Sequence, residues 1–183
     1  MKYYVVLIRG INVGGKNKIP MSKLKICLED IGFSNVTTYI ASGNVIVGSN
    51  KKADQIKRLI EKSLPKYFKL DSNILKVLVL TKSQIQAVVS HKPKGFGDEP
   101  KKYHSDVIFL MEITATQAMK VFTPKEGVDK IWKGRGVVYS QRLSALRTKS
   151  RLNRIMMAPE YKSMTIRNWN TTTKLAQLMG DKS

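Results

Sequence analysis

Hydrophobic and polar positions along the first 80 residues alternate between two patterns: continuous apolar runs typical of buried strands, and the three-and-four spacing of helices. They predict a strand over 2–10 (KYYVVLIRG), a helix over 20–33, a hairpin over 35–49, a second helix over 51–65 and a strand over 73–80. We expect the hairpin to turn at Ser42-Gly43-Asn44 and the second helix to end at Pro65. This order of elements is that of the split βαβ, or ferredoxin-like, unit.

The same pattern recurs, more weakly, in the second half of the chain. A helix over 81–91, capped by Thr81 or Ser83, leads into a loop rich in Gly, Pro and Lys over 92–103. The pattern then predicts a strand (105–113), a short helix (114–122), a hairpin (129–140), a helix (144–156), a strand (163–169) and a last helix (171–179).

The predicted fold class is therefore α+β, with two ferredoxin-like (split β-α-β) subdomains in tandem plus a C-terminal helix. The first subdomain is expected over residues 1–80 and a linking helix and loop over 81–104. The second subdomain, which includes the C-terminal helix, is expected over 105–183. One larger mixed sheet is the alternative.

The totals fit this organisation. The chain has 183 residues and 42% hydrophobic content, enough for one large domain or two small ones with packed cores. No apolar run approaches the roughly 20 residues that span a bilayer, and the N-terminal stretch lacks a signal-peptide cleavage site. Cys27 is the only cysteine, which excludes an internal disulfide and a multi-cysteine metal site. We expect a cytoplasmic protein with no membrane partner, no cofactor and no bound metal.

The net charge of +20, with a sequence pI near 10.1, favours polyanionic partners. The charge is spread evenly. Residues 1–90 hold 15 Lys and Arg against 5 Asp and Glu, and residues 91–183 hold 18 against 8. Each half thus carries the same surplus of ten, so composition alone does not separate a specific basic patch from a generally basic surface.

The loop "RGINVGGKNKIP" (9–20) spells G-x-x-x-x-G-K from Gly10, as in a phosphate-binding P-loop. Asn17 replaces the hydroxyl residue of that motif, and the predicted helix begins too late for its N-terminus to face a phosphate. The sequence therefore favours a tight glycine turn at Gly14-Gly15. A further hypothesis is an anion-binding loop, in which the N–H groups of these glycines form a nest helped by nearby basic side chains.

In a split βαβ unit, the first loop and the turn at Ser42-Gly43-Asn44 lie at the same end of the sheet. Two polar, glycine-containing loops at one end are consistent with a small ligand site. The candidate ligand-binding residues there are Arg9, Asn12, Gly14, Gly15, Lys16, Lys18, Ser42 and Asn44.

The C-terminal block "TIRNWNTTTKL" (165–175) contributes further candidates where a strand meets a helix N-terminus, a favourable place for an anion. The candidates are Arg167, Asn168 and Thr171. The structural alternative is that Asn170 or Thr171 caps the last helix and that Trp169 packs between the subdomains.

The stretch "QRLSALRTKSRLNR" (141–154) holds five basic residues and no acid. On a helix, Arg147, Arg151 and Arg154 would share one face, which makes this the best candidate for a nucleic-acid patch. A solvated basic face is the alternative. An RNA-recognition module is disfavoured, because "NVIVG" (44–48) offers no aromatic side chain for stacking.

Three blocks, "RGINVGGKNKIPMSKL", "YIASGNVI" and "TIRNWNTTTKL", together resemble a bacterial family catalogued as domain-of-unknown-function family sixteen-ninety-seven, and most of all its streptococcal members. The resemblance runs from about residue 2 to about residue 178 and implies a pair of α+β subdomains, but no activity. It departs from the family at Arg151, in a stretch where a Lys is usual. The residues that match the family's pattern are Arg9, Gly10, Asn12, Gly14, Gly15, Ser42, Gly43, Asn44, Arg167, Asn168, Trp169, Thr171 and Lys174.

Three function classes remain. The leading hypothesis is a non-catalytic basic protein that binds an anionic ligand, either nucleic acid or a phosphorylated small molecule. The second is an enzyme that positions an anionic substrate with Arg9, Asn12, Ser42, Asn44 and Arg167. The third is a structural or regulatory module for a protein partner. The sequence identifies no catalytic residue, since His91 and His104 are each more typical of a surface or capping position.

Overall fold

A computed structural model describes residues 1–71 and 75–182 of the chain. The fold is α+β, with two separate four-stranded antiparallel sheets and a C-terminal helix. The alternative of one larger mixed sheet is therefore wrong. No helix of the described residues is long and apolar enough to cross a bilayer.

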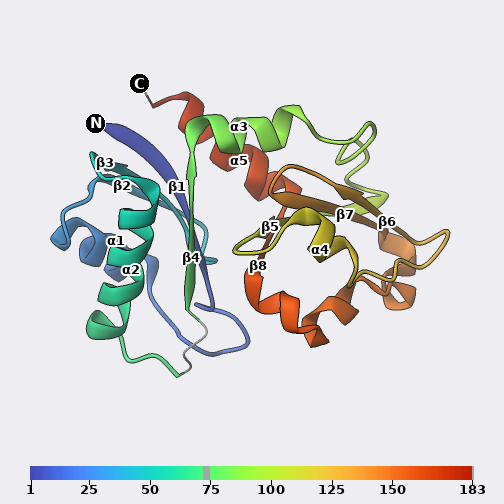
Figure 1. Cartoon of the computed structure of the whole chain (residues 1–183), viewed down its shortest axis with the longest axis horizontal. Helices are drawn as coiled ribbons and strands as arrows, with labels where there is room; N and C mark the ends of the chain where they lie inside the picture. Colours follow the sequence, from blue (N-terminus) through green and yellow to red (C-terminus); the bar gives the residue numbers. More distant parts are fainter. Residues whose placement is uncertain (72–74, 183) are drawn as a thin grey trace. The chain divides into compact units, whose positions relative to one another are not determined.

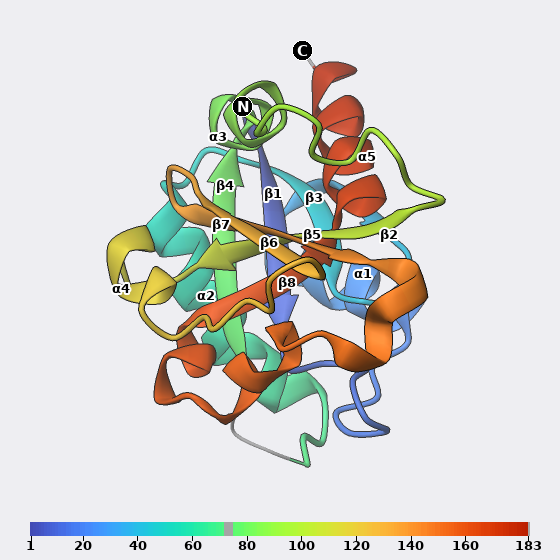
Figure 2. The ribbon, with the colours of Figure 1, turned by 90° about the vertical axis from the view of Figure 1, so that its right-hand side faces the viewer.

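The first sheet contains β1 (Lys2–Arg9), β2 (Ser34–Tyr39), β3 (Asn44–Ser49) and β4 (Lys76–Thr81), in the order β2-β3-β1-β4. Because every neighbouring pair is antiparallel, β1 and β2 run in the same direction with β3 between them. Figure 2 shows β1 between β4 and β3. The C-terminal end of β1 and the β2–β3 turn therefore lie at the same end of this sheet.

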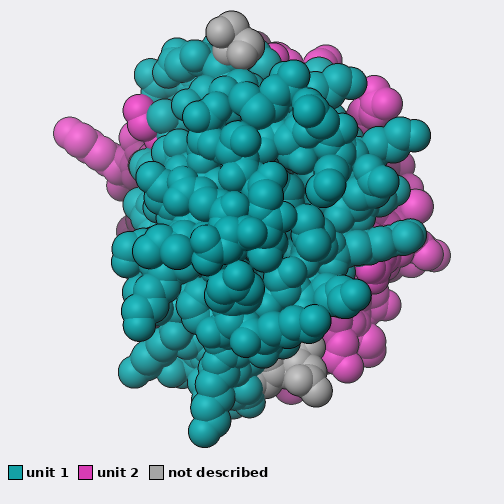
Figure 3. Space-filling view, turned by 90° about the vertical axis from the view of Figure 1, so that its left-hand side faces the viewer, with its two compact units in different colours: residues 1–85, 175–183 teal, residues 86–174 magenta. Residues whose placement is uncertain are grey.

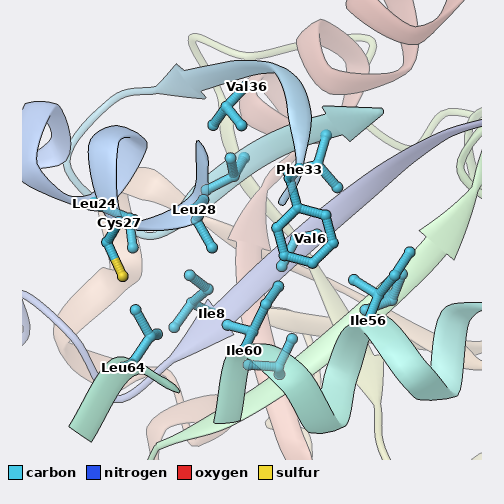
Figure 4. Close-up of a cluster of buried hydrophobic side chains, with 14 of the residues drawn as sticks. Val6, Ile8, Leu24, Cys27, Leu28, Phe33, Val36, Ile56, Ile60 and Leu64 are labelled. Carbon is cyan, nitrogen blue, oxygen red and sulfur yellow. The ribbon is translucent and has the colours of Figure 1, made fainter. Parts of the chain in front are cut away.

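The helices α1 (Met21–Asp30) and α2 (Ala53–Tyr67) cover one face of this sheet (Figure 1). Their apolar stripes enclose the core with alternate residues of the strands, as Figure 4 shows for Val6, Ile8 and Leu24. Cys27 lies in this core at 1% exposure, and burial raises the pKa of its thiol to about 11, with a smaller contribution from Asp30. The helical spacing read from the sequence thus identifies the buried faces of both helices.

The second sheet repeats the arrangement. It contains β5 (Tyr103–Leu110), β6 (Asp129–Lys133), β7 (Val137–Leu143) and β8 (Met164–Asn168), in the order β6-β7-β5-β8. Its core packs around Ile108, Val138 and Met164, with α4 (Ala115–Met119) on the same side. The remaining helices are α3 (Lys82–Ser90) and α5 (Trp169–Gly180). As expected, Thr81 caps α3, because its Oγ1 accepts the Gln84 N–H and Gln84 Oε1 accepts the Thr81 N–H.

Two local predictions are wrong. Pro65 lies inside α2, which continues to Tyr67, because the proline removes only the hydrogen bond of its own N–H and the Phe68 N–H after it still donates to Leu64 O at 2.9 Å. The predicted helix over 144–156 is instead two 3₁₀ turns, Ser144–Lys149 and Leu152–Met157, and a third, Pro159–Ser163, follows them. Ser150 is extended, with ψ of 142°, and interrupts any continuous helix. Figure 2 shows these turns in orange between β7 and β8. Asn73 and Ile74 of the fourth predicted strand lie outside the described residues.

The chain divides into two compact units, one of Met1–Ile85 with Leu175–Ser183 and one of Gln86–Lys174 (Figure 3). The domain boundaries expected at residues 80 and 104 stay a prediction. The two units divide α5, because its second half belongs to the first unit and its first half to the second.

Candidate functional site

The first glycine loop is a small hairpin. Lys16 N–H donates to Val13 O at 3.1 Å, and the two glycines at its tip have φ of 58° (Gly14) and 75° (Gly15). Two consecutive positive φ angles are those of a type I′ turn, which favours Gly-Gly. The following helix begins only at Met21. The loop is therefore a turn rather than a P-loop, as the sequence favours.

Two asparagines with positive φ hold this hairpin in place. Asn12 accepts the Ile19 N–H at 2.7 Å and donates to Ile19 O at 2.9 Å and to Ala41 O at 2.8 Å. Asn17 is fully buried and donates its side-chain amide to Gly10 O, while its backbone N–H and Oδ1 bond to Asp71. Asn17, which replaces the P-loop hydroxyl, thus has a structural role.

The β2–β3 turn lies against the same end of the sheet, as the strand order predicted. Ile8 N–H donates to Gly43 O at 2.8 Å, and a Cβ on Gly43 would lie 2.6 Å from Ile8 O. Asn44 is fully buried and donates its side-chain amide to Ser42 Oγ and Tyr39 O. The close approach at Gly43 and these hydrogen bonds explain why this turn requires its residues for structure.

An open depression of about 360 Å³ lies between these loops. Ile19, Pro20, Met21 and Ala41 supply an apolar lining, while Lys18 contributes the positive charge. Among the other predicted residues, Lys16 is exposed, and Arg9 is half-buried at the end of β1, paired in register with Lys76. The structure thus brings these candidates to one end of the first unit, and ligand contact by them stays a prediction.

The C-terminal candidates belong to the second unit, around the junction of β8 and α5. Arg167 is 8% exposed and donates to Thr165 Oγ1 and Ile166 O, and burial lowers the pKa of its guanidinium to about 10. Asn168 Oδ1 accepts the Thr171 N–H at 2.7 Å, so Asn168 caps α5. The prediction that Asn170 or Thr171 is the cap is therefore wrong, because the helix begins two residues earlier than its apolar spacing indicates.

The basic segment of the second unit lies on the surface. Arg147, Arg151 and Arg154 are all exposed, and none of their guanidinium groups forms an ion pair with a described residue. Leu152 and Ile155, which directly follow Arg151 and Arg154, are buried in the core of the unit. The common helical face predicted for the three arginines is wrong because the helix does not form, but alternation with buried residues still leaves them outside.

The main-chain path of this segment is fixed by two side chains of the neighbouring strands. Asp129 Oδ2, from β6, accepts the N–H of Arg151 at 2.8 Å and that of Lys125 at 2.9 Å. Arg142 Nη1, from β7, donates to Asn153 Oδ1 at 3.0 Å. The segment is thus held through its backbone and through Asn153, which leaves the guanidinium groups of the three arginines exposed.

A polar cluster that the sequence interpretation missed lies beside Arg142 in the second sheet. His104 Nε2 is 3.1 Å from Asp106 Oδ1, and Arg142 Nη2 is 3.9 Å from Asp106 Oδ2. Burial raises the pKa of the Asp106 carboxyl, although both neighbours oppose the shift. The alternation in "YHSDVIF" places His104 and Asp106 on one face of a strand, which is the signal that could have identified the pair.

Comparison with known proteins identifies the family. The model of a family described as "Protein of unknown function (DUF1697)" matches residues 1–139. The chain belongs to this family. A search among curated proteins gives no match. The matched part contains the glycine hairpin and the β2–β3 turn, whereas the basic turns and the β8–α5 junction follow it.

A solved structure supports the fold of this DUF1697 member over nearly its whole length. It is described as the structure of conserved bacterial protein SP0830 from Streptococcus pneumoniae, and it is 24% identical in sequence with a TM-score of 0.79. The alignment covers 97% of this chain and 98% of that chain. At this identity the likeness concerns the fold.

Proposed function

We propose that this protein binds polyanions without catalysing a reaction, and that the sugar-phosphate backbone of nucleic acid is its partner. The observation that carries the proposal is the exposed basic segment with Arg147, Arg151 and Arg154. Residues 130–159 hold eight Lys and Arg and no Asp or Glu, so no acid within this stretch neutralises the surface they form. Closely spaced cations of this kind displace the counterions of a nucleic acid, which drives binding.

The fixed backbone of the segment supports the same proposal. Because Leu152 and Ile155 are buried and Asp129 holds the Arg151 N–H, the arginines need not give up main-chain freedom when they bind. A planar guanidinium donates two hydrogen bonds to one phosphate, which is the contact expected here. Exposed Lys16 and Lys18 of the glycine hairpin are proposed to add positive charge on the first unit.

We also propose that each unit is a ferredoxin-like (split β-α-β) subdomain. The strand orders β2-β3-β1-β4 and β6-β7-β5-β8 support this proposal. In each sheet the first and third strands of the unit form an antiparallel centre, and the second and fourth strands lie at the two edges. In the second unit, 3₁₀ turns replace the second helix.

The proposal is tested by the salt dependence of oligonucleotide binding. Fluorescence anisotropy with a labelled oligonucleotide measures log Kd against log salt for the wild type and for the triple variant Arg147→Ala, Arg151→Ala, Arg154→Ala. We expect tight binding at low salt and a slope that falls by about two to three in the triple variant, close to one per lost phosphate contact.

A matched variant removes three charges elsewhere. Arg58, Lys62 and Lys66 are exposed on α2, and their replacement by Ala lowers the net charge equally. We expect this control to retain the wild-type slope. Affinity that does not change with salt overturns the proposed phosphate contacts. Equal loss in the two triple variants overturns the assignment to the segment, and displacement of the oligonucleotide by millimolar inorganic phosphate points to a small phosphorylated ligand instead.

A further inference from the structure

A small hollow lies in the second unit. Of the predicted site residues, only Asn168 is part of its lining. Its volume is about 100 Å³, and its lining includes Tyr103, His104, Asn168, Trp169 and Asn170. This is the size of one small planar ring rather than of a whole nucleotide.

The hollow has aromatic walls that are held in place. Trp169 packs edge-on against Phe96, with ring centroids 5.2 Å apart and planes at 78°. Gly97 has φ of 77° and lies so close to the indole that an added Cβ would be 2.3 Å from its atoms. Tyr103, at the start of β5, supplies a second ring. The two rings are not in contact with each other in the described part of the chain.

The rim of the hollow carries hydrogen-bonding groups. Asn168 uses Oδ1 to cap α5, which leaves its two Nδ2 protons to donate elsewhere. The side chain of Asn170 is exposed and makes no hydrogen bond to a described residue. His104 is oriented by Asp106, 3.1 Å away. Amide groups recognise the edges of nucleobases, and an imidazole ring can stack on an unpaired base.

The start of the basic segment adjoins the chain that leads into the hollow. Ser144 N–H, at the start of the segment, donates to Lys102 O at 2.9 Å, and Lys102 directly precedes Tyr103. The ammonium groups of Lys102 and Lys130 lie 5.2 and 5.7 Å from the centroid of the Tyr103 ring. A strand whose base enters the hollow would therefore have cations beside the sugar-phosphate backbone that flanks it.

We propose that this hollow binds one unpaired base of a single-stranded nucleic acid, and that its size favours a pyrimidine. The inference rests on the proposed function, because the basic segment supplies the backbone contacts and the hollow adds contacts to the base. Aromatic walls and a positively charged border are the combination by which proteins bind single strands. A paired base cannot enter, because its edge and faces are covered in the duplex.

The test compares three labelled ligands of twelve nucleotides: oligo-dT, an abasic strand of the same length and charge, and a duplex of twelve base pairs. At one fixed salt concentration we expect the wild type to bind oligo-dT about tenfold more tightly than the abasic strand, which corresponds to one stacked base. Tyr103→Leu and Asn170→Ala should each lower this ratio towards one without changing the salt slope. Tyr67→Leu is the control, because Tyr67 is an exposed tyrosine on α2.

The outcomes separate the two proposals. Equal, salt-dependent binding of oligo-dT and the abasic strand overturns the base site and leaves the polyanion function standing. Tighter binding of the duplex than of oligo-dT also overturns the base site. If none of the three ligands binds at low salt, the proposed function fails and the base site with it. A ratio that falls as much in Tyr67→Leu as in Tyr103→Leu refutes the assignment to the hollow.

Discussion

Replacement of Asn12 by Ala separates a structural role of the glycine hairpin from a ligand-binding one. The side chain makes three hydrogen bonds to main-chain atoms, two to Ile19 and one to Ala41, and each contributes about 0.5 to 1.5 kcal/mol to stability. Asn12 also has φ of 54°, a region that Asn tolerates and Ala adopts at a cost of roughly 1 kcal/mol. Because the site is partly exposed, we expect a total loss of about 3 kcal/mol in the free energy of unfolding.

Asn35→Ala is the matched control. Asn35 has φ of 52°, but it is exposed and donates one hydrogen bond, to Tyr3 Oη at 2.9 Å. The backbone cost is therefore shared by the two variants, and the difference between them measures the hydrogen bonds of Asn12. We expect Asn12→Ala to be less stable than Asn35→Ala by about 2 kcal/mol.

Urea unfolding followed by circular dichroism gives both free energies by linear extrapolation, provided that the m-values of the variants agree. Loss of stability in Asn12→Ala without ligand would mean that any effect on binding is indirect. The reasoning is refuted if Asn12→Ala is no less stable than Asn35→Ala. In that case the hydrogen bonds to Ile19 and Ala41 do not hold the loop, and a direct role of Asn12 with a ligand becomes the better explanation.

Three further predictions concern the contact of Gly97 with Trp169, the buried thiol of Cys27 and the carboxyl group of Asp106. Gly97→Ala should cost about 2 kcal/mol or more relative to Gly95→Ala in urea unfolding, because both glycines have φ near 78° but only Gly97 would clash with Trp169. Cys27 should resist iodoacetamide at pH 8 in the folded protein and react after unfolding, since burial both covers its thiol and raises the pKa of that thiol to about 11. Burial raises the pKa of Asp106 above the ordinary value of 3.8, so the folded protein holds this proton more tightly than the unfolded chain does. The free energy of unfolding should therefore fall as the pH rises from 3.8 through the raised pKa. Asp106→Asn should flatten the free energy of unfolding, measured in urea, over that range of pH.

Most elements of the first unit could be predicted from the sequence because their signals are local. The continuous apolar run of β1 and the three-and-four spacing of α1 and α2 depend only on neighbours along the chain. The β2–β3 turn was also predicted from a local signal, Ser42-Gly43-Asn44. In the structure Gly43 has a φ of 72°, which a glycine adopts readily.

The basic segment shows where local signals fail. Its spacing is helical, yet the backbone is extended at Ser150, and the Asp129 carboxylate bonds to the Arg151 N–H 22 residues away. Burial of Leu152 and Ile155 then fixes the turns on either side. Tertiary contacts of this kind outweigh weak helix propensity.

The sequence by itself determined the positive charge, the element types of the first unit and the strand order that brings the first loop to the β2–β3 turn. Only the tertiary structure decided what the polar side chains there do. Asn12 meets Ala41 29 residues away, and Asn17 meets Asp71 54 residues away. A buried polar group must find a hydrogen-bond partner, and when that partner lies so far along the chain, no local pattern records it.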